Sequence, residues 1–322
     1  MQSEAVSHPN IALIKYWGNR DNELRIPANG SISMTLGGLE NRMTVRFDDE
    51  IETDTLMING KSAAPPMLER ASRHLDLMRR QAGIDAGARV ESVTNIPLGA
   101  GIASSAAAYA ALTVASASAL GLELDQRALS RIARRGSASA ARSIYGGFVE
   151  LIAGDGDHSS FAKQIVPADH WQIIDLIVLV DEDIKHTGST SGHALAASSP
   201  LQQSRIVDAP RRLKVCLRAI LDRDFESLAQ IVERDSDMMH AIMMTSEPPL
   251  HFWNGDTLQI MAAVRDLRAQ GASVCYTVDA GPNVHCLCLP DSEADALQAL
   301  TDAGKRPWRV LRGHPGPAAR VV

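Results

Sequence analysis

The sequence is poor in cysteine, and this argues against two common ways of stabilising a fold. Its 322 residues include only Cys216, Cys275, Cys286 and Cys288, and no two of them form a Cys-x-x-Cys pair. A disulfide framework or zinc site is therefore disfavoured, and we expect buried thiols. Cys286 and Cys288 alternate, so they would share one face of a strand. This sparse usage also favours a reducing, cytoplasmic location.

An excess of positive charge and a long apolar run are also missing. The formal net charge is −6, which disfavours a general nucleic-acid binder. The densest apolar run, 173–180, contains Asp175 and is too short to span a bilayer, so we expect a buried strand there. The opening MQSEAVSHPN lacks the apolar segment of a secretory signal. We therefore expect no nucleic-acid or membrane partner.

The remaining sequence is typical of a globular α+β protein, with 45% hydrophobic and 22% charged residues and no internal repeat. A change in pattern near residue 175 predicts two halves, 1–175 and 176–322, with a ligand cleft between them. Residues 181–200 are expected to form a polar loop. Strands are predicted at 42–47, 88–93, 173–180, 273–278, 284–289 and 308–312, and helices at 66–83, 104–120, 127–145 (interrupted), 205–221, 225–244, 257–270 and 293–303.

The stretch NIPLGAGIASSAA, residues 95–107, leads from a loop into an alanine-rich helix. A helix amino terminus offers free N–H groups and the positive end of the helix dipole, which favour phosphate. Gly99 and Gly101 would let the backbone approach the phosphate, and Ser104 and Ser105 would add hydroxyls or help to place Mg²⁺. No lysine follows, so this is not a Walker loop. The residues alone also fit a simple turn before a buried helix.

A second glycine–serine cluster, RRGSASAARSIYGG at 134–147, contains Arg142 among small neighbours. A guanidinium there could project into a cavity and hold a carboxylate or phosphate in a bidentate manner. The alternative is a solvated position on a helix face, which suits Arg134 better than Arg142.

Two further charged residues, Lys15 and Asp279, lie in an apolar run and in a short turn-like motif, respectively. Lys15 lies in NIALIKYWG, next to Tyr16 and Trp17, in a chain with only four tyrosines and four tryptophans. It either faces solvent from a strand or lines an anionic pocket. Asp279 follows a predicted strand in VDAGPN, where it either shapes a tight turn or acts as a general base at a cleft.

Five motifs, in this order, resemble the GHMP kinase superfamily, and most closely its mevalonate diphosphate decarboxylase and phosphomevalonate decarboxylase branch. They are NIALIKYWG, PANGSISMTL, NIPLGAGIASSAA, GSASAARSIYGGF and DAGPN, and they extend from Asn10 to about Leu289. The resemblance implies an amino-terminal domain like ribosomal protein S5 and a ferredoxin-like carboxy-terminal domain, with the active site between them. It also implies a homodimer.

The resemblance further implies an ATP-dependent decarboxylase. ATP would phosphorylate the 3-hydroxyl of a 5-phosphorylated mevalonate, after which phosphate and CO2 would leave. Asp279 would orient or deprotonate the hydroxyl, Arg142 would hold the carboxylate, and Lys15 would support the anionic groups. Substrate contacts would come from Tyr16, Asn19, Ser137, Ser139 and Ser189. ATP and Mg²⁺ would be bound by Asn95, Pro97, Gly99, Gly101, Ser104 and Ser105, with Ser104 as the candidate metal ligand.

One departure from the family pattern bears on the substrate. The motif reads KYWGN, with Asn19 where many members that use a diphosphate have lysine, and Thr190 stands where bacterial relatives often have arginine. This loss of positive charge favours mevalonate 5-phosphate as substrate and isopentenyl phosphate as product. The alternative is the 5-diphosphate, with Arg20 compensating. A mevalonate 3-kinase without decarboxylation and a non-catalytic relative are further alternatives.

Two sets of residues receive looser assignments. Adenine contacts are expected from residues 67–73 and 92–95. His8, His186 and His193 are expected at the surface or at helix caps.

Overall fold

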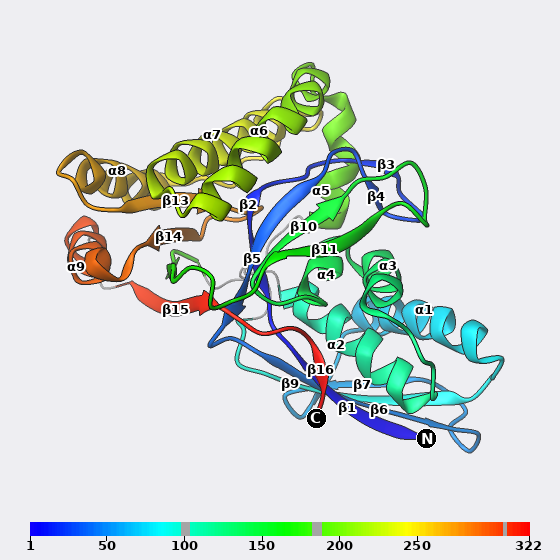
Figure 1. Ribbon diagram of the computed structural model, residues 1–322. Helices are drawn as coiled ribbons and strands as arrows, with labels where there is room; N and C mark the ends of the chain where they lie inside the picture. The colour runs from blue at the N-terminus through cyan, green and yellow to red at the C-terminus, as the bar shows by residue number, and fades with distance from the viewer. Residues whose placement is uncertain (98–103, 182–188, 305–307) are drawn as a thin grey trace.

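The larger of the two main sheets contains strands from both halves of the sequence (Figure 1). The computed structural model describes residues 1–97, 104–181, 189–304 and 308–322. Within them the sheet has the order β11-β10-β5-β15-β12-β14-β13, with β2 also paired to β5, and every pair is antiparallel. The strands are β2 (Asn10–Ile14), β5 (Ser31–Gly37), β10 (Phe148–Ile152), β11 (Phe161–Val166), β12 (Ile174–Leu179), β13 (Val274–Val278), β14 (Val284–Cys288) and β15 (Arg309–Pro315).

The smaller sheet has the order β16-β1-β6-β9-β7-β8 and is antiparallel except where β7 pairs with β9. Strand β16 pairs with β1, so the two ends of the chain lie close together (Figure 1). A separate short hairpin pairs β3 with β4. The strands are β1 (Gln2–Ser7), β3 (Asn19–Asp21), β4 (Ile26–Pro27), β6 (Asn41–Asp48), β7 (Thr55–Ile58), β8 (Lys61–Ser62), β9 (Gly87–Thr94) and β16 (Arg320–Val321).

Four helices of the first half lie between the two sheets and beside the smaller one. Helix α1 has proline in its first turn and ends at Gly83, whose left-handed φ of 68° lets its N–H reach the Arg79 carbonyl. The small side chains of α2 let it pack closely on the smaller sheet. Gly136 ends α3 where a Cβ would collide with the Tyr109 ring. The helices are α1 (Pro65–Ala82), α2 (Ser104–Ala119), α3 (Gln126–Gly136) and α4 (Ala140–Ser143).

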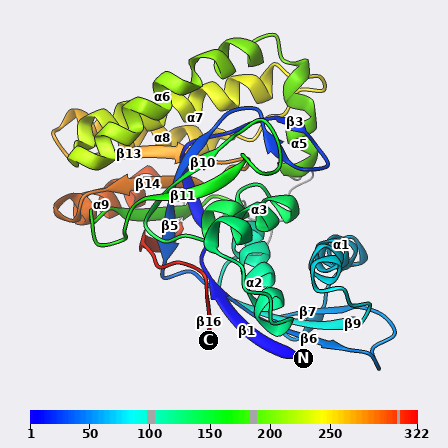
Figure 2. The same ribbon diagram turned by 45° about the vertical axis from the view of Figure 1, so that its right-hand side comes forward.

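The helices of the second half cover both faces of the larger sheet (Figure 2). Helices α6 and α7 pack in one hydrophobic cluster with Cys275 and Leu287, whereas α8 and α9 pack in another with Cys286 and Cys288. The predicted helix at 225–244 is confirmed, and it starts where the Asp224 carboxylate caps it by accepting from the Ser227 N–H. The helices are α5 (Ser189–Leu195), α6 (Gln202–Asp222), α7 (Phe225–Met244), α8 (Gly255–Ala269) and α9 (Glu293–Ala303), with short 3₁₀ turns at Ala196–Ser198 and Pro290–Ser292.

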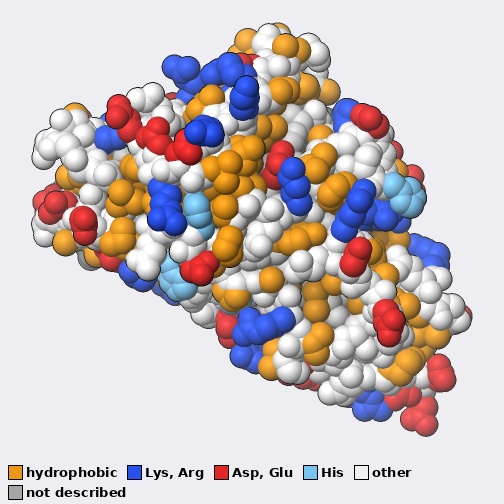
Figure 3. Space-filling view, in the orientation of Figure 1, with side chains coloured by type: hydrophobic (Ala, Val, Ile, Leu, Met, Phe, Trp, Pro, Cys, Tyr) orange, Lys and Arg blue, Asp and Glu red, His pale blue; other side chains and the backbone are white. Residues whose placement is uncertain are grey.

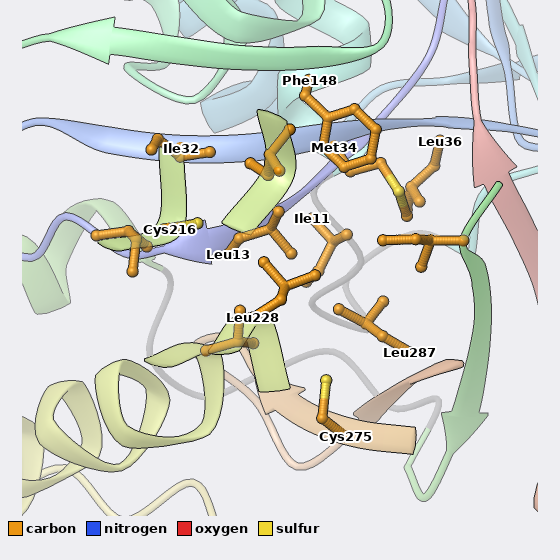
Figure 4. Packing of buried hydrophobic residues seen from close by; sticks show 14 of the residues in the cluster. Ile11, Leu13, Ile32, Met34, Leu36, Phe148, Cys216, Leu228, Cys275 and Leu287 are labelled. Atoms are coloured by element: carbon orange, nitrogen blue, oxygen red, sulfur yellow. The ribbon is translucent and has the colours of Figure 1, made fainter. Parts of the chain in front are cut away.

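The largest hydrophobic cluster packs β2, a strand of the larger sheet, against α6 and α7 (Figure 4). Ile11 and Leu13 of β2 meet Leu228 of α7, and Cys275 and Leu287 of the neighbouring strands close the cluster. Each large aliphatic side chain buried in this way contributes roughly 1.5–3 kcal/mol. The position of Lys15, directly after β2, is therefore set by one of the best-packed parts of the molecule.

The prediction of a polar loop at 181–200 is wrong at its carboxy-terminal end, where residues 189–195 form α5. The shared face predicted for Cys286 and Cys288 is confirmed, because both pack in one hydrophobic cluster with β12 and α8. Charged side chains of both signs are spread over the face in Figure 3. The division of the chain at 175/176 stays a prediction.

Candidate active site

Lys15 and Asp279 meet in a direct ion pair, although they are far apart in the sequence. Lys15 follows β2, Asp279 follows β13, and the Lys15 Nζ donates to Asp279 Oδ1 at 2.5 Å. The Lys15 side chain is 2% exposed, and that of Asp279 is 25% exposed. Burial acts to raise the pKa of Asp279, but Lys15, His285 and Arg142 hold it below its ordinary value. Asp279 is therefore an ionised carboxylate that can accept a hydrogen bond.

Arg142 is buried beside this pair without a carboxylate of its own. From α4 its Nε and Nη2 donate to Asn10 Oδ1 at 3.2 and 3.0 Å, and its Nη1 donates to Ser31 Oγ at 2.6 Å. Among the described residues it makes no ion pair. Burial lowers its pKa, while Tyr16 and Asp279 oppose that shift. A guanidinium held by neutral partners keeps its charge uncompensated, and the role predicted for Arg142 in holding an anion stays a prediction.

Hydroxyl groups extend from this pocket to the start of α2. Ser139 Oγ lies 3.1 Å from Ser137 Oγ, which lies 3.5 Å from Ser105 Oγ. Ser104 begins α2 and lines the next cavity with Ser105. The predicted substrate serines and the predicted phosphate serines are therefore continuous in space. Ser189 is the first residue of α5.

The cavity at the start of α2 is largely apolar and has a volume of about 130 Å³. It brings together residues from both stretches predicted to contact adenine. These are Met67, Arg70, Ala71, Ser92 and Thr94.

The other residues predicted to bind the nucleotide either do not line this cavity or lie outside the described residues. Asn95 lies outside the group that lines the cavity, and its side chain fixes a turn by accepting from the Glu40 N–H and donating to the Gly38 carbonyl. Pro97 is half-buried at the end of the described segment. Gly99 and Gly101 lie outside the described residues.

His193 is placed differently from its prediction as a surface or capping residue. Its ring stacks on Tyr16, with centroids 4.6 Å apart, and lies 4.4 Å from Trp17. Burial lowers the pKa of His193 to about 3, so Nδ1 is free to accept from the Gly18 N–H at 3.0 Å. His8 is also buried and bonded to the Leu39 carbonyl, and His186 lies outside the described residues.

Tyr16 directly follows Lys15, and Asn19 is the first residue of β3. Burial raises the pKa of Tyr16 to about 12, against the opposing charges of Arg142 and Arg25, so its hydroxyl is neutral. Asn19 Nδ2 donates to Asn22 Oδ1 at 3.2 Å, and Asn19 Oδ1 is buried without a partner in the described structure. Arg20 donates to the Gly154 carbonyl and lies 3.7 Å from Asp155.

The sequence reasoning misjudged Arg134. It is fully buried rather than solvated, and it donates to Asp157 Oδ1 at 2.5 Å as well as to the carbonyls of Leu24 and Ser160. Asp157 lies in a loop that folds back over α3, a tertiary contact that the local pattern around Arg134 does not contain.

A buried charge network that supports the backbone of Lys15 was also missed. Asp235 of α7 accepts from the Lys15 N–H at 2.6 Å and from Arg212 Nε at 2.7 Å. Arg205 donates to the Lys15 carbonyl at 2.8 Å, and Asn29 donates to the same oxygen. Arg205 and Arg212 are seven positions apart on α6, a helical spacing that places both on one face and is a usable signal.

Two family models match the chain and together cover most of it. The N-terminal domain of diphosphomevalonate decarboxylase-like proteins matches residues 7–162. The C-terminal domain of mevalonate 5-diphosphate decarboxylase matches residues 175–307.

Curated relatives are similar over almost the whole chain. Diphosphomevalonate decarboxylase of Candida albicans is 38% identical over 302 residues, which cover 88% of this chain and 83% of that one. The human diphosphomevalonate decarboxylase is 37% identical over 313 residues, covering 90% and 78%.

Solved structures agree in fold. One described as "MDDEF in complex with MVAPP, AMPPCP and Magnesium" superposes with a TM-score of 0.95 at 35% identity, covering 100% of this chain and 99% of that one. Mevalonate diphosphate decarboxylase from Staphylococcus aureus gives 0.93 at 35% identity, covering 100% and 98%.

With these matches, the two sheets and their helices are identified as the GHMP kinase fold, as the sequence motifs predict. The class of protein is thus an ATP-dependent carboxy-lyase. More narrowly, the chain belongs to the mevalonate diphosphate decarboxylase family. No helix in the described ranges has the length and apolarity needed to cross a bilayer.

Proposed function

We propose that this protein uses ATP and Mg²⁺ to convert mevalonate 5-diphosphate into isopentenyl diphosphate, CO2, ADP and phosphate. The observation that carries the proposal is the Lys15–Asp279 pair beside a buried Arg142 that has no carboxylate partner in the described structure. The loss of positive charge at Asn19 and Thr190 predicts mevalonate 5-phosphate instead. The comparisons do not support that preference and instead support its stated alternative, the diphosphate.

The first half of the reaction needs a group that accepts a proton from a tertiary alcohol. Asp279 is ionised, and its carboxylate is open to the cleft on one side. It would accept a hydrogen bond from the 3-hydroxyl and take its proton as the oxygen attacks the γ-phosphate. Lys15 fixes the carboxylate and would offset the negative charge that develops nearby. Hydroxide is a poor leaving group, and phosphorylation converts the alcohol into a better one.

The second half needs a positioned carboxylate. Arg142 would hold it through its guanidinium, while Asn10 and Ser31 fix the orientation of that group. As the C3–O bond breaks, positive charge develops at C3. The electron pair of the bond to the carboxylate carbon then forms the C=C bond, and CO2 leaves. Because Asp279 and Arg142 lie in one pocket, the site has groups for both steps.

The cavity beside α2 fits a nucleotide base. It is apolar apart from a few groups, and the buried Asn41 Oδ1 that lines it has no partner in the described structure. An amino group on a ligand would satisfy that acceptor. Ser104 and Ser105 would reach the phosphates, with Ser104 as the candidate metal ligand. When bound, Mg²⁺ supplies charge neutralisation for phosphoryl transfer.

The experiment is a direct comparison of the two substrates. Purified protein is incubated with Mg·ATP and either mevalonate 5-diphosphate or mevalonate 5-phosphate, and CO2 release is measured. We expect a higher kcat/KM for the diphosphate. A higher value for the monophosphate would contradict the substrate assignment, and no turnover of either would indicate a non-catalytic relative. The assigned site roles, the homodimer and the cytoplasmic location stay predictions.

A further inference from the structure

A cavity rich in arginine lies between α1, the end of α3 and the turn that joins β3 to β4. Its volume is about 530 Å³. Five arginines line it, against two carboxylates, those of Glu23 and Asp76. The arginines are Arg25, Arg70, Arg73, Arg80 and Arg135. This imbalance of charge marks the cavity as a place for an anion.

The positive charge in the cavity is largely uncompensated. Asp76 is engaged by Arg79 at 2.7 Å, outside the group that lines the cavity. Within the described part of the chain, Arg25, Arg70 and Arg135 make no ion pair. The Nε atoms of Arg70 and Arg135 are buried without a hydrogen-bond partner. Arg25, Arg70 and Arg135 are half-buried, and an anionic ligand would supply the counter-charge that they lack among the described residues.

The cavity that Arg25 lines extends to Gly136, the residue directly before the predicted substrate serine Ser137. On the cavity side, the charge of Arg25 acts on Tyr109 and on His74 of α1. On the pocket side, it acts on Tyr16 and His193, whose rings are stacked 4.6 Å apart. Arg25 also has a left-handed φ of 51°, a conformation that non-glycine residues rarely adopt. The surrounding turn therefore holds Arg25 in a strained backbone conformation.

Neither Asn19 nor Arg20 of the KYWGNR motif supplies a free positive charge for a second phosphate. Asn19 is neutral, and its Nδ2 is bonded within its own turn to Asn22. Arg20 is 46% exposed and is engaged by the Gly154 carbonyl and Asp155. Arg25 is half-buried and is free of hydrogen bonds and ion pairs to described residues.

We propose that Arg25 holds the terminal phosphate of the substrate's diphosphate, and so supplies the positive charge that Asn19 does not. The inference rests on the proposed function, because it needs a diphosphate in the pocket. Tyr16 would bind the phosphate chain between Arg25 and Arg142. The terminal phosphate would also offset the like charges of Arg25 and Arg70, which both line the cavity. Arg25 is thus a residue that determines specificity for two phosphates over one.

The test measures kcat and KM of wild type and Arg25→Gln with mevalonate 5-diphosphate and with mevalonate 5-phosphate. We expect Arg25→Gln to lower kcat/KM for the diphosphate about 10- to 100-fold, the loss of one charged hydrogen bond, mostly through KM. The monophosphate should change by less than about twofold, because it lacks the phosphate that Arg25 contacts. Arg25→Lys should retain part of the preference.

Two further variants test whether the change in kcat/KM comes from the positive charge at this site or from a general loss of activity. Arg20→Gln removes a neighbouring cation that points elsewhere, so it should leave both substrates unchanged. Asn19→Lys in the Arg25→Gln background should restore diphosphate use at least in part. Thermal unfolding of each variant checks that the protein is folded. Arg25→Gln should unfold at a temperature similar to wild type, because a left-handed φ strains glutamine and arginine to a similar extent.

Equal losses with both substrates, or no loss with either, would overturn the role of Arg25 while leaving the proposed function intact. Wild type that turns over only the monophosphate, or neither compound, would overturn the proposed function and the inference with it. Direct binding of mevalonate 5-diphosphate without ATP, measured by calorimetry, gives a second reading that does not depend on turnover. It should weaken in Arg25→Gln and stay unchanged in Arg20→Gln.

Discussion

Arg134 and Arg142 are both buried and lie on neighbouring helices, but their partners differ in kind. Arg134 is bonded to Asp157 and to two backbone carbonyls, so its charge is neutralised within the fold. Arg142 is held only by Asn10 and Ser31, which orient the guanidinium without neutralising it. Burial alone therefore does not distinguish a structural arginine from one that serves a ligand. The distinction lies in whether the fold supplies the counter-charge.

Two acids, Asp279 and Asp235, differ in a similar way, and the variant of Asp279 has the largest expected effect on turnover. Asp279 faces the cleft, whereas Asp235 is fully buried between Arg205 and Arg212. Asp279→Asn should lower kcat about 10²- to 10⁴-fold, because it removes the proton acceptor, and should leave the fold and ATP binding largely intact. Asp235→Asn should instead reduce stability, since two buried arginines lose their counter-ion. Near-normal turnover of Asp279→Asn would refute its assigned role.

Arg142→Gln tests the uncompensated arginine itself. We expect kcat/KM for mevalonate 5-diphosphate to fall about 10²- to 10³-fold, because a charged bidentate contact to the carboxylate is lost. The free energy of unfolding should change by less than about 1 kcal/mol, since glutamine can still bond to Asn10 and no carboxylate is left unpaired. Steady-state kinetics and urea unfolding check the two parts. Retention of normal CO2 release would contradict the assignment.

Arg134→Gln should show the reverse pattern. We expect a loss of about 2–3 kcal/mol in the free energy of unfolding, less than for a fully buried pair because Asp157 keeps Arg131 at 2.6 Å. Once corrected for the folded fraction, kcat/KM should stay within about twofold of wild type. Urea unfolding monitored by circular dichroism measures the first quantity. If turnover fell as far as in Arg142→Gln, the division between structural and functional arginines would be wrong.

Buried histidines extend the comparison to groups that the fold keeps uncharged. Burial lowers the pKa of His74 and of His240 to about 3, from an ordinary 6.5. Below about pH 6.5 the unfolded chain therefore binds protons that the folded protein does not, and stability falls as the pH drops towards 3. Each histidine should contribute about 1.4 kcal/mol per pH unit in that window. Urea unfolding at pH 7, 6 and 5 measures the slope.

His240→Gln supplies the control for this pH dependence, since it should remove its own share of the slope. An unchanged slope would show that His240 does not stay neutral in the folded protein. Between pH 7 and pH 5 Asp279 remains ionised, because its pKa is held below its ordinary value. Activity lost between those pH values would therefore report unfolding rather than protonation of Asp279.

Local sequence signals predicted the helices and the strand ends well. Helix α7 was predicted at its observed bounds because its apolar spacing is regular and Asp224 caps its start. Strand β5 was not predicted, although residues 31–36 alternate polar and apolar side chains, which is a usable strand signal. All seven of its residues are nevertheless buried, which the alternating pattern does not indicate. Helix α5 was hidden in a stretch rich in glycine, serine and threonine.

The motifs predicted that Lys15, Arg142 and Asp279 belong to one site, and the structure brings them together, while their roles stay predictions. Partners distant in sequence could not be predicted. Arg134 finds Asp157 through a loop, Tyr16 stacks on His193 from a later helix, and neither contact leaves a local pattern. Arg25 was overlooked for the same reason, since its surroundings come from three separate helices.

The most direct test of the central claim is the number of CO2 molecules released per ADP formed when wild type turns over mevalonate 5-diphosphate. The pairing of Asp279 with an uncompensated Arg142 in one pocket predicts a ratio of one, because each phosphorylated substrate is held for loss of its carboxylate. ADP formation without CO2 would contradict the account, since it would make the protein a 3-kinase and leave Arg142 without its assigned partner.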